Sequence, residues 1–114
     1  MISILYNIYN NLLHKHHNDI LIRLPERIQY YINREENKIK YIMLDTLYKQ
    51  SSKLDIILQL LEKQDDDIIR LLFNKELNAL IMVANLDVDI LETFLDKPKL
   101  ITKLIKSDQF NKKI

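Results

Sequence analysis

The apolar residues of this chain recur every three or four positions along most of its length, which is the spacing of one face of an α-helix. The pattern is clearest at the start, where Asn and Lys occupy the opposite face. The apolar face there comprises Met1, Ile4, Leu5, Ile8, Tyr9, Leu12 and Leu13. We expect this helix to end near His17, where Asn18 or Asp19 caps a new start that leads into Pro25.

Residues 25–50 fit two patterns. As helix, their apolar positions share one face that is broken at Glu35 and Glu36, which gives one long helix or two helices joined near residues 33–37. As strands, residues 27–32 and 38–43 form a hairpin, which their Tyr and Ile content favours. We favour helix, because the loop lacks glycine and the apolar face continues past residue 43; the hairpin stays the open alternative.

Beyond Ser51 the pattern indicates a series of short helices, each preceded by a residue that suits an N-terminal cap. Ser52 and Asp55 imitate a capping box, Pro98 suits the first turn of the last helix, and the end from Ser107 is expected to fray. The other predicted caps are Asp66 or Asp67, Asn74, Asp87, and Asp96 or Lys97. The helix from Lys53 to Lys63 is apolar on more than one side, so we expect it at the centre of the core.

These patterns together predict an all-α protein. We expect a compact bundle of about six to seven mostly short helices, with orthogonal or helical-hairpin packing. A single helical domain is expected over residues 1–106, followed by a frayed tail over residues 107–114.

Two segments that begin at Asp55 and Asp89 share one order of residues: an acidic residue, two apolar residues and, at the end, an acidic residue and a lysine. Their separation along the chain is close to the length of an ankyrin repeat. Both resemble the second helix of such a repeat, and residues 78–84 resemble a first helix. The chain has neither the glycine that follows that second helix nor the Thr-Pro-Leu-His turn. We therefore do not assign it to the ankyrin repeats, and we interpret the recurrence as repetition of capped Ile and Leu helices.

The chain contains no glycine and no cysteine. Lack of glycine excludes glycine-rich phosphate loops and dinucleotide fingerprints, and lack of cysteine excludes disulfides, thiol nucleophiles and cysteine-ligated metals. Phe, Tyr, Met, Ile, Asn and Lys number 53, whereas Gly, Ala, Arg and Pro number 8. This skew follows the AT content of codons and indicates an AT-rich genome, whether viral, parasite or bacterial. We expect no enzyme activity, no cofactor and no small-molecule substrate, and a location in the cytoplasm or the interior of a host cell.

Three further features give little indication of function. His14, His16 and His17 are the only concentration of metal-ligating side chains, and we interpret them as a polar helix end, because a zinc site needs three or four fixed ligands. The longest apolar run, residues 79–84, is too short to cross a bilayer. The segment from Met1 to Leu13 lacks the basic start and the cleavage site of a secretory signal, so we expect a soluble protein.

The charge is distributed unevenly although the net charge is only +1. Residues 1–54 carry 8 basic and 5 acidic side chains, residues 55–96 carry 3 and 10, and residues 97–114 carry 6 and 1. The last predicted helix bears a stripe of lysines beside its apolar face, at Lys99, Lys103 and Lys106. Such a stripe suits an acidic partner, although lysine is also favoured near a helix C-terminus.

Aromatic and basic residues alternate between Arg27 and Tyr41, as in surfaces that bind nucleic acid, although Glu26, Glu35 and Glu36 dilute them. We expect a non-enzymatic protein–protein interaction module, an adaptor or regulator whose partners include a second copy of itself. The alternative is a small helical nucleic-acid-binding protein that uses the basic C-terminal helix and the segment from Arg27 to Tyr41. The expected partner contacts are Lys99, Lys103, Lys106, Tyr30, Arg34 and Phe73.

Overall fold

The computed structural model describes residues 15–112, with side chains up to Ser107, and every regular element in this part is a helix. The first covers residues 15–21. It is followed by α2 (Glu26–Asn33), α3 (Asn37–Lys49), the 3₁₀ helix η1 (Ser51–Lys53), α4 (Leu54–Glu62), α5 (Asp66–Leu72), α6 (Asn78–Ala84), α7 (Val88–Asp96) and α8 (Leu100–Lys112). The predicted all-α fold of mostly short helices is confirmed. The apolar face predicted between Met1 and Leu13 lies outside the described residues.

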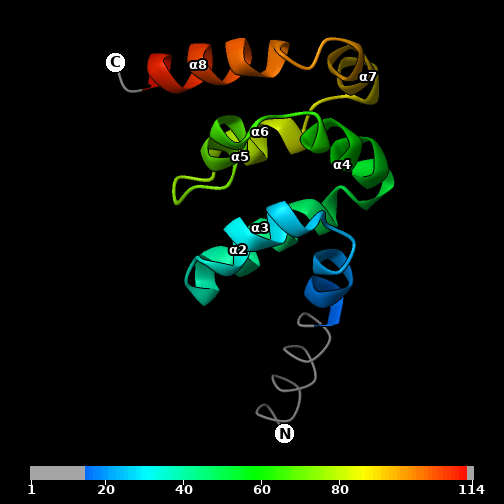
Figure 1. Cartoon of the computed structure of the whole chain (residues 1–114), viewed down its shortest axis with the longest axis vertical. Helices are drawn as coiled ribbons and strands as arrows, with labels where there is room; N and C mark the ends of the chain where they lie inside the picture. Colours follow the sequence, from blue (N-terminus) through cyan, green and yellow to red (C-terminus); the bar gives the residue numbers. More distant parts are fainter. Residues whose placement is uncertain (1–14, 113–114) are drawn as a thin grey trace, which may run out of the picture.

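Within the bundle the helices lie in layers, which rise from the helix of residues 15–21 in the lower half of Figure 1, past α2 and α3, to α8 at the top. Helix α4 packs on α7, helix α3 packs on α6, and α6 also contacts α5 and α8. Helices α4 and α7 begin at Leu54 and Val88, so they correspond to the two similar segments that start at Asp55 and Asp89. These two equivalent helices therefore stack on each other.

The side-chain hydrogen bonds between helices follow the same spacing. Within residues 15–107 all of them join positions that are 31 to 39 residues apart. Contacts restricted to neighbouring units are the property of repeat folds. The recurrence that we interpreted as repeated capping is thus also a repeat in space. It differs from an ankyrin repeat in that α5 occupies the stretch between α4 and α6.

The core runs through the stack as a continuous cluster of Ile and Leu side chains. Helix α4 lies at its centre, because the side chains of Leu54, Ile57, Leu60 and Leu61 are all 0% exposed. Leu58, on another side of α4, is only partly buried. The apolar excess of this helix therefore reflects a central position in the core.

Residues 25–50 form two helices and no hairpin, with the break at residues 34–36, where the apolar face is interrupted. Pro25 stands directly before the first helical residue of α2. At the other end of the chain, α8 continues through Lys112 and thus past Ser107, where we expected the tail to begin.

The helix expected to end near His17 continues to residue 21. The reason is that His17, at 2% exposure, and Ile20 and Leu24, at 3% and 4%, extend the buried face at helical spacing. His17 therefore belongs to the core and is not the polar helix end that we expected.

Several predicted caps are also wrong. Asp96 and Lys97, expected to cap the last helix, are the last residue and the C-cap of α7, and α8 begins only at Leu100. Ser52 lies in η1, so no capping box forms before α4, and Asp55 instead pairs with Arg23 at 2.7 Å. Helix α5 is capped by Asp65, whose carboxylate accepts a hydrogen bond from the backbone N–H of Ile68 at 3.1 Å, and not by Asp66.

The start of α6 differs as well. Asn74 does not cap it, because its side-chain oxygen accepts a bond from the N–H of Glu76 at 2.8 Å in a local turn. Helix α6 begins after Leu77, whose φ of 62° lies in the left-handed region. A chain without glycine here uses a leucine, which is 8% exposed, so burial of its side chain offsets the backbone strain.

Candidate functional site

An open groove of about 530 Å³ lies where α7 turns into α8. Pro98 ends the run of α7 because it has no backbone N–H, and the turn closes with a bond from the N–H of Leu100 to the carbonyl of Lys97 at 3.1 Å. Pro98 and Leu100 are half-buried and supply the apolar part of the groove. The complete lining is Lys63, Lys97, Pro98, Lys99, Leu100 and Lys103. We call this site the basic groove.

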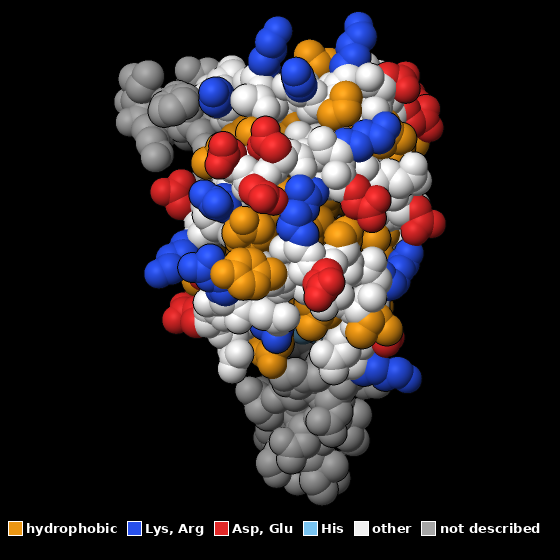
Figure 2. Space-filling view, in the orientation of Figure 1, with side chains coloured by type: hydrophobic (Ala, Val, Ile, Leu, Met, Phe, Trp, Pro, Cys, Tyr) orange, Lys and Arg blue, Asp and Glu red, His pale blue; other side chains and the backbone are white. Residues whose placement is uncertain are grey.

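The four lysines of the basic groove are all exposed. Lys63 donates a hydrogen bond to the carbonyl of Leu95 at 3.0 Å. Within the described part of the chain, the side-chain ammonium groups of Lys97, Lys99 and Lys103 form no hydrogen bond or ion pair. Figure 2 shows Lys and Arg side chains along the upper edge of the molecule, where α8 lies. This edge is a concentration of positive charge next to apolar surface.

Only part of the predicted lysine stripe lies in the basic groove. Lys99 and Lys103 line the basic groove. Lys106 is exposed further along α8, outside the groove. Sequence reasoning did not find Lys63 and Lys97. The available signal was their shared place at the end of the two similar segments that start at Asp55 and Asp89.

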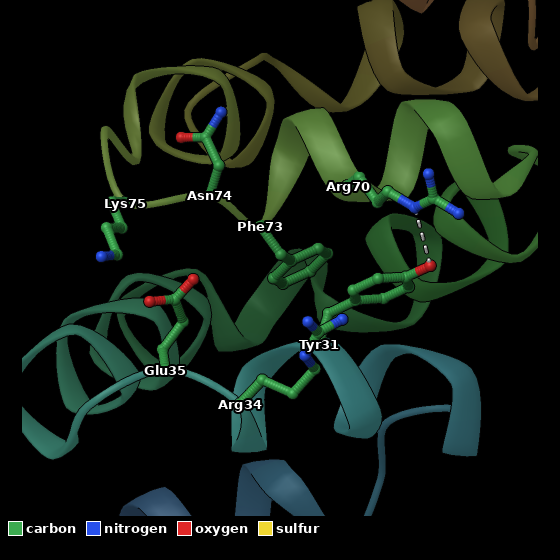
Figure 3. A pocket seen from close by; sticks show the side chains of 7 residues that line it. All are labelled: Tyr31, Arg34, Glu35, Arg70, Phe73, Asn74 and Lys75. Atoms are coloured by element: carbon green, nitrogen blue, oxygen red, sulfur yellow. Dashed lines mark hydrogen bonds between the residues drawn. The ribbon is translucent and has the colours of Figure 1, made fainter.

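A second hollow, of about 380 Å³, lies between α2 and the end of α5. Figure 3 shows its lining: Tyr31, Arg34, Glu35, Arg70, Phe73, Asn74 and Lys75. Phe73, one of the predicted partner contacts, is 3% exposed and belongs to the core cluster while its ring borders this hollow. It offers a partner little area, because its outer surface is already covered.

Two polar contacts organise the rim of this hollow. Arg70 donates from Nε to the Tyr31 hydroxyl at 3.4 Å, and this bond raises the pKa of Arg70 above its already high ordinary value (Figure 3). The Arg34 guanidinium lies 5.3 Å from the centre of the Tyr30 ring, a cation–π distance. Tyr30 is 59% exposed, so it and Arg34 form an exposed pair beside the hollow.

The alternating segment from Arg27 to Tyr41 does not form one continuous surface. Arg27 donates from Nη1 to the carbonyl of Gln64 at 2.8 Å and from Nη2 to that of Leu61 at 3.1 Å. The ring of Tyr41 stacks on His17 at 5.1 Å. The basic and aromatic side chains of this segment are therefore divided between internal contacts and solvent.

The histidines hold packing positions. The ring of His16 stacks on Tyr48 at 4.6 Å between centres, and His17 is buried against Tyr41. His14 lies outside the described residues. In the part of the chain that the structure describes, no group of three or more His, Cys, Asp or Glu residues is arranged to hold a metal ion.

No helix between residues 15 and 112 has both the length and the hydropathy that a membrane span requires. Comparison of the chain with models of protein families, with curated proteins and with solved structures finds no match.

Proposed function

We propose that this chain is a non-enzymatic protein-binding module, an adaptor or regulator that engages an acidic protein partner through the basic groove. The observation that supports this most is the composition of the groove. It combines the apolar surface of Pro98 and Leu100 with three lysines whose ammonium groups form no hydrogen bond or ion pair among the described residues.

Protein interfaces use this combination in a characteristic way. An apolar side chain that fills a pocket supplies most of the binding energy, and charges around it steer the approach and fix orientation. The lysines of the basic groove are exposed, so they keep their hydration until a partner arrives and then meet its carboxylates at the rim.

A protein partner fits the basic groove better than nucleic acid does. Nucleic acid binding relies on phosphate contacts along a charged track and on exposed rings on which bases stack. The basic groove has no aromatic residue in its lining. The exposed ring of Tyr30 lies outside the groove and already makes a cation–π contact with Arg34, so it is not free for a base to stack on.

The test uses the full chain with a photoreactive phenylalanine derivative in place of Leu100, in the groove, or of Lys38, an exposed position on α3. We expect a protein adduct from the groove position that the control does not give. The identified protein, once purified, should bind the unmodified chain at moderate salt. Leu100→Ala should weaken this binding about thirtyfold, since hot-spot truncations cost about 2 kcal/mol.

The opposite result is equally clear. A groove-specific adduct with RNA or DNA contradicts the proposal and favours the nucleic-acid alternative. The affinity of the chain for that nucleic acid should then fall about tenfold per phosphate contact for each tenfold rise in salt concentration.

A further inference from the structure

Arg27 and Lys63 each bind the C-terminal end of a helix in the next layer. Arg27 donates to the carbonyl of Leu61 in the last turn of α4, at 3.1 Å. Lys63 donates to the carbonyl of Leu95 in the last turn of α7, at 3.0 Å. Leu61 and Leu95 occupy equivalent places in the stacked helices, because each is the penultimate residue of its helix. In both helices, therefore, the carbonyl of the penultimate residue accepts a hydrogen bond from a cation of the preceding layer.

Lys97 repeats the position of Lys63 one layer further on. Both lysines are the C-cap residues of their helices, and each follows an acidic residue, Glu62 or Asp96. Lys63 reaches the helix stacked on its own, whereas Lys97 has no acceptor within residues 15–107. It is exposed and borders the basic groove beside Pro98.

The chemistry that would complete this position is that of a helix C-terminus. The last carbonyls of a helix lack intrahelical donors, and the helix dipole gives this end partial negative charge. An acidic residue there is unfavourable in the free helix and becomes favourable beside lysines. The helices that Arg27 and Lys63 bind also end in acidic residues, Glu62 and Asp96.

We propose that the basic groove receives the acidic C-terminal turn of an amphipathic helix from a protein partner, whose last carbonyls accept hydrogen bonds from Lys97. An apolar side chain of that turn packs on Pro98 and Leu100, and its carboxylates face Lys99 and Lys103. The proposal rests on the proposed function, and it extends to the partner the layer-to-layer contact that the chain makes internally.

The probe is a fluorescent peptide that copies residues 87–96 of this chain, because α7 is the helix that Lys63 binds. A side-chain crosslink holds it helical, since so short a peptide does not form a stable helix in water. A second peptide has the same charge but carries proline in place of Thr93, which breaks the helix. Both are titrated with the full chain at moderate salt, and fluorescence anisotropy reports binding.

We expect the helical peptide to bind at least tenfold more tightly than the proline peptide. Lys97→Met should weaken its binding about tenfold, as loss of a hydrogen bond from a charged donor predicts. Lys38→Met, which removes an exposed lysine outside the groove, should leave it unchanged. Circular dichroism checks that both variants keep the helical content of the parent.

Three results overturn the inference. If both peptides bind equally and Lys97→Met weakens both, the groove takes extended acidic segments, and the proposed function stands without the helix. If neither peptide binds at millimolar concentration, the helix-end site is excluded, while photocrosslinking from position 100 decides on the proposed function separately. If sedimentation shows a dimer that Lys97→Met dissociates, the occupant is a second copy of this chain.

Discussion

Replacement of Arg27 by methionine is expected to destabilise the fold by about 2 to 3 kcal/mol, because its guanidinium donates hydrogen bonds to the free carbonyls at the end of α4. Arg27 donates to the carbonyls of Gln64, Leu61 and Glu62 at 2.8, 3.1 and 3.3 Å. It also lies 3.4 Å from a carboxylate oxygen of Asp66. Methionine keeps the apolar stem in place, so the loss measures the charged group.

The magnitude follows from the exposure of these groups. A hydrogen bond from a charged donor contributes about 1.5 to 3 kcal/mol, and the cation at the helix end about 0.3 to 1 kcal/mol more. The three bonds do not add, because Arg27 is 34% exposed and water replaces part of what is lost. The pair with Asp66 adds little, since that carboxylate is 60% exposed and such pairs contribute about 0 to 1 kcal/mol.

Urea unfolding followed by circular dichroism measures the change, with Arg34→Met as the matched control. Arg34 is exposed and contacts the ring of Tyr30, so its loss should cost about 0.5 to 1 kcal/mol. For Arg27→Met the thermal midpoint should fall by about 6 to 15 °C in a domain of this size. Equal stability of the two variants would refute the role that we assign to Arg27 at the end of α4.

Three further pairs of substitutions test the packing of α4, the left-handed residue before α6 and the cation at the end of α7. Leu61→Ala, at a side chain that is 0% exposed, should cost about 2 to 5 kcal/mol in urea unfolding, and Leu58→Ala less than half of that, because Leu58 is only partly buried; similar losses would mean that α4 is not central. Leu77→Gly should be more stable than Leu77→Ala by about 1 kcal/mol, the reverse of the order within a helix, since φ is 62° there; the usual order would exclude a left-handed residue. Lys63→Met should cost about 1 kcal/mol in thermal unfolding and Lys97→Met close to nothing, because only Lys63 has an acceptor among the described residues; equal losses would contradict the different roles of the two lysines.

The helical fold was predictable because the apolar spacing carries it. The break between α2 and α3 was one of the helical alternatives that the sequence left open, because Glu35 and Glu36 interrupt the apolar face. The caps were less predictable, because three adjacent aspartates compete for one position before α5 and a shift of one residue decides which of them binds the backbone. The burial of His17 was not predictable from local spacing alone, since its ring packs on Tyr41, which belongs to a different helix, α3.

Part of the basic groove was also within reach of the sequence. Lys99 and Lys103 follow from helical spacing, and the groove contains both. Arg27 shows the limit of such reasoning. Its neighbours in sequence suggested a surface for nucleic acid, whereas its guanidinium binds carbonyls at the end of α4, in another layer of the stack. The direction of a long side chain depends on the layer packed against it, which only the fold reveals.

Because the chain has no glycine, these cations bind helix-end carbonyls that a glycine cap would otherwise satisfy. Many helices end with a left-handed glycine whose N–H groups bind the last free carbonyls. At the end of α4 the C-cap Lys63 is right-handed, and the additional donors come from Arg27. Lys53 does the same at the end of α6, where its ammonium group donates to the carbonyls of Ala84 and Leu86 at 3.0 and 2.8 Å. Because these donors come from a different layer, the helix ends are completed only when the layers stack. The proposed site extends this contact to Lys97, whose ammonium group has no acceptor within residues 15–107.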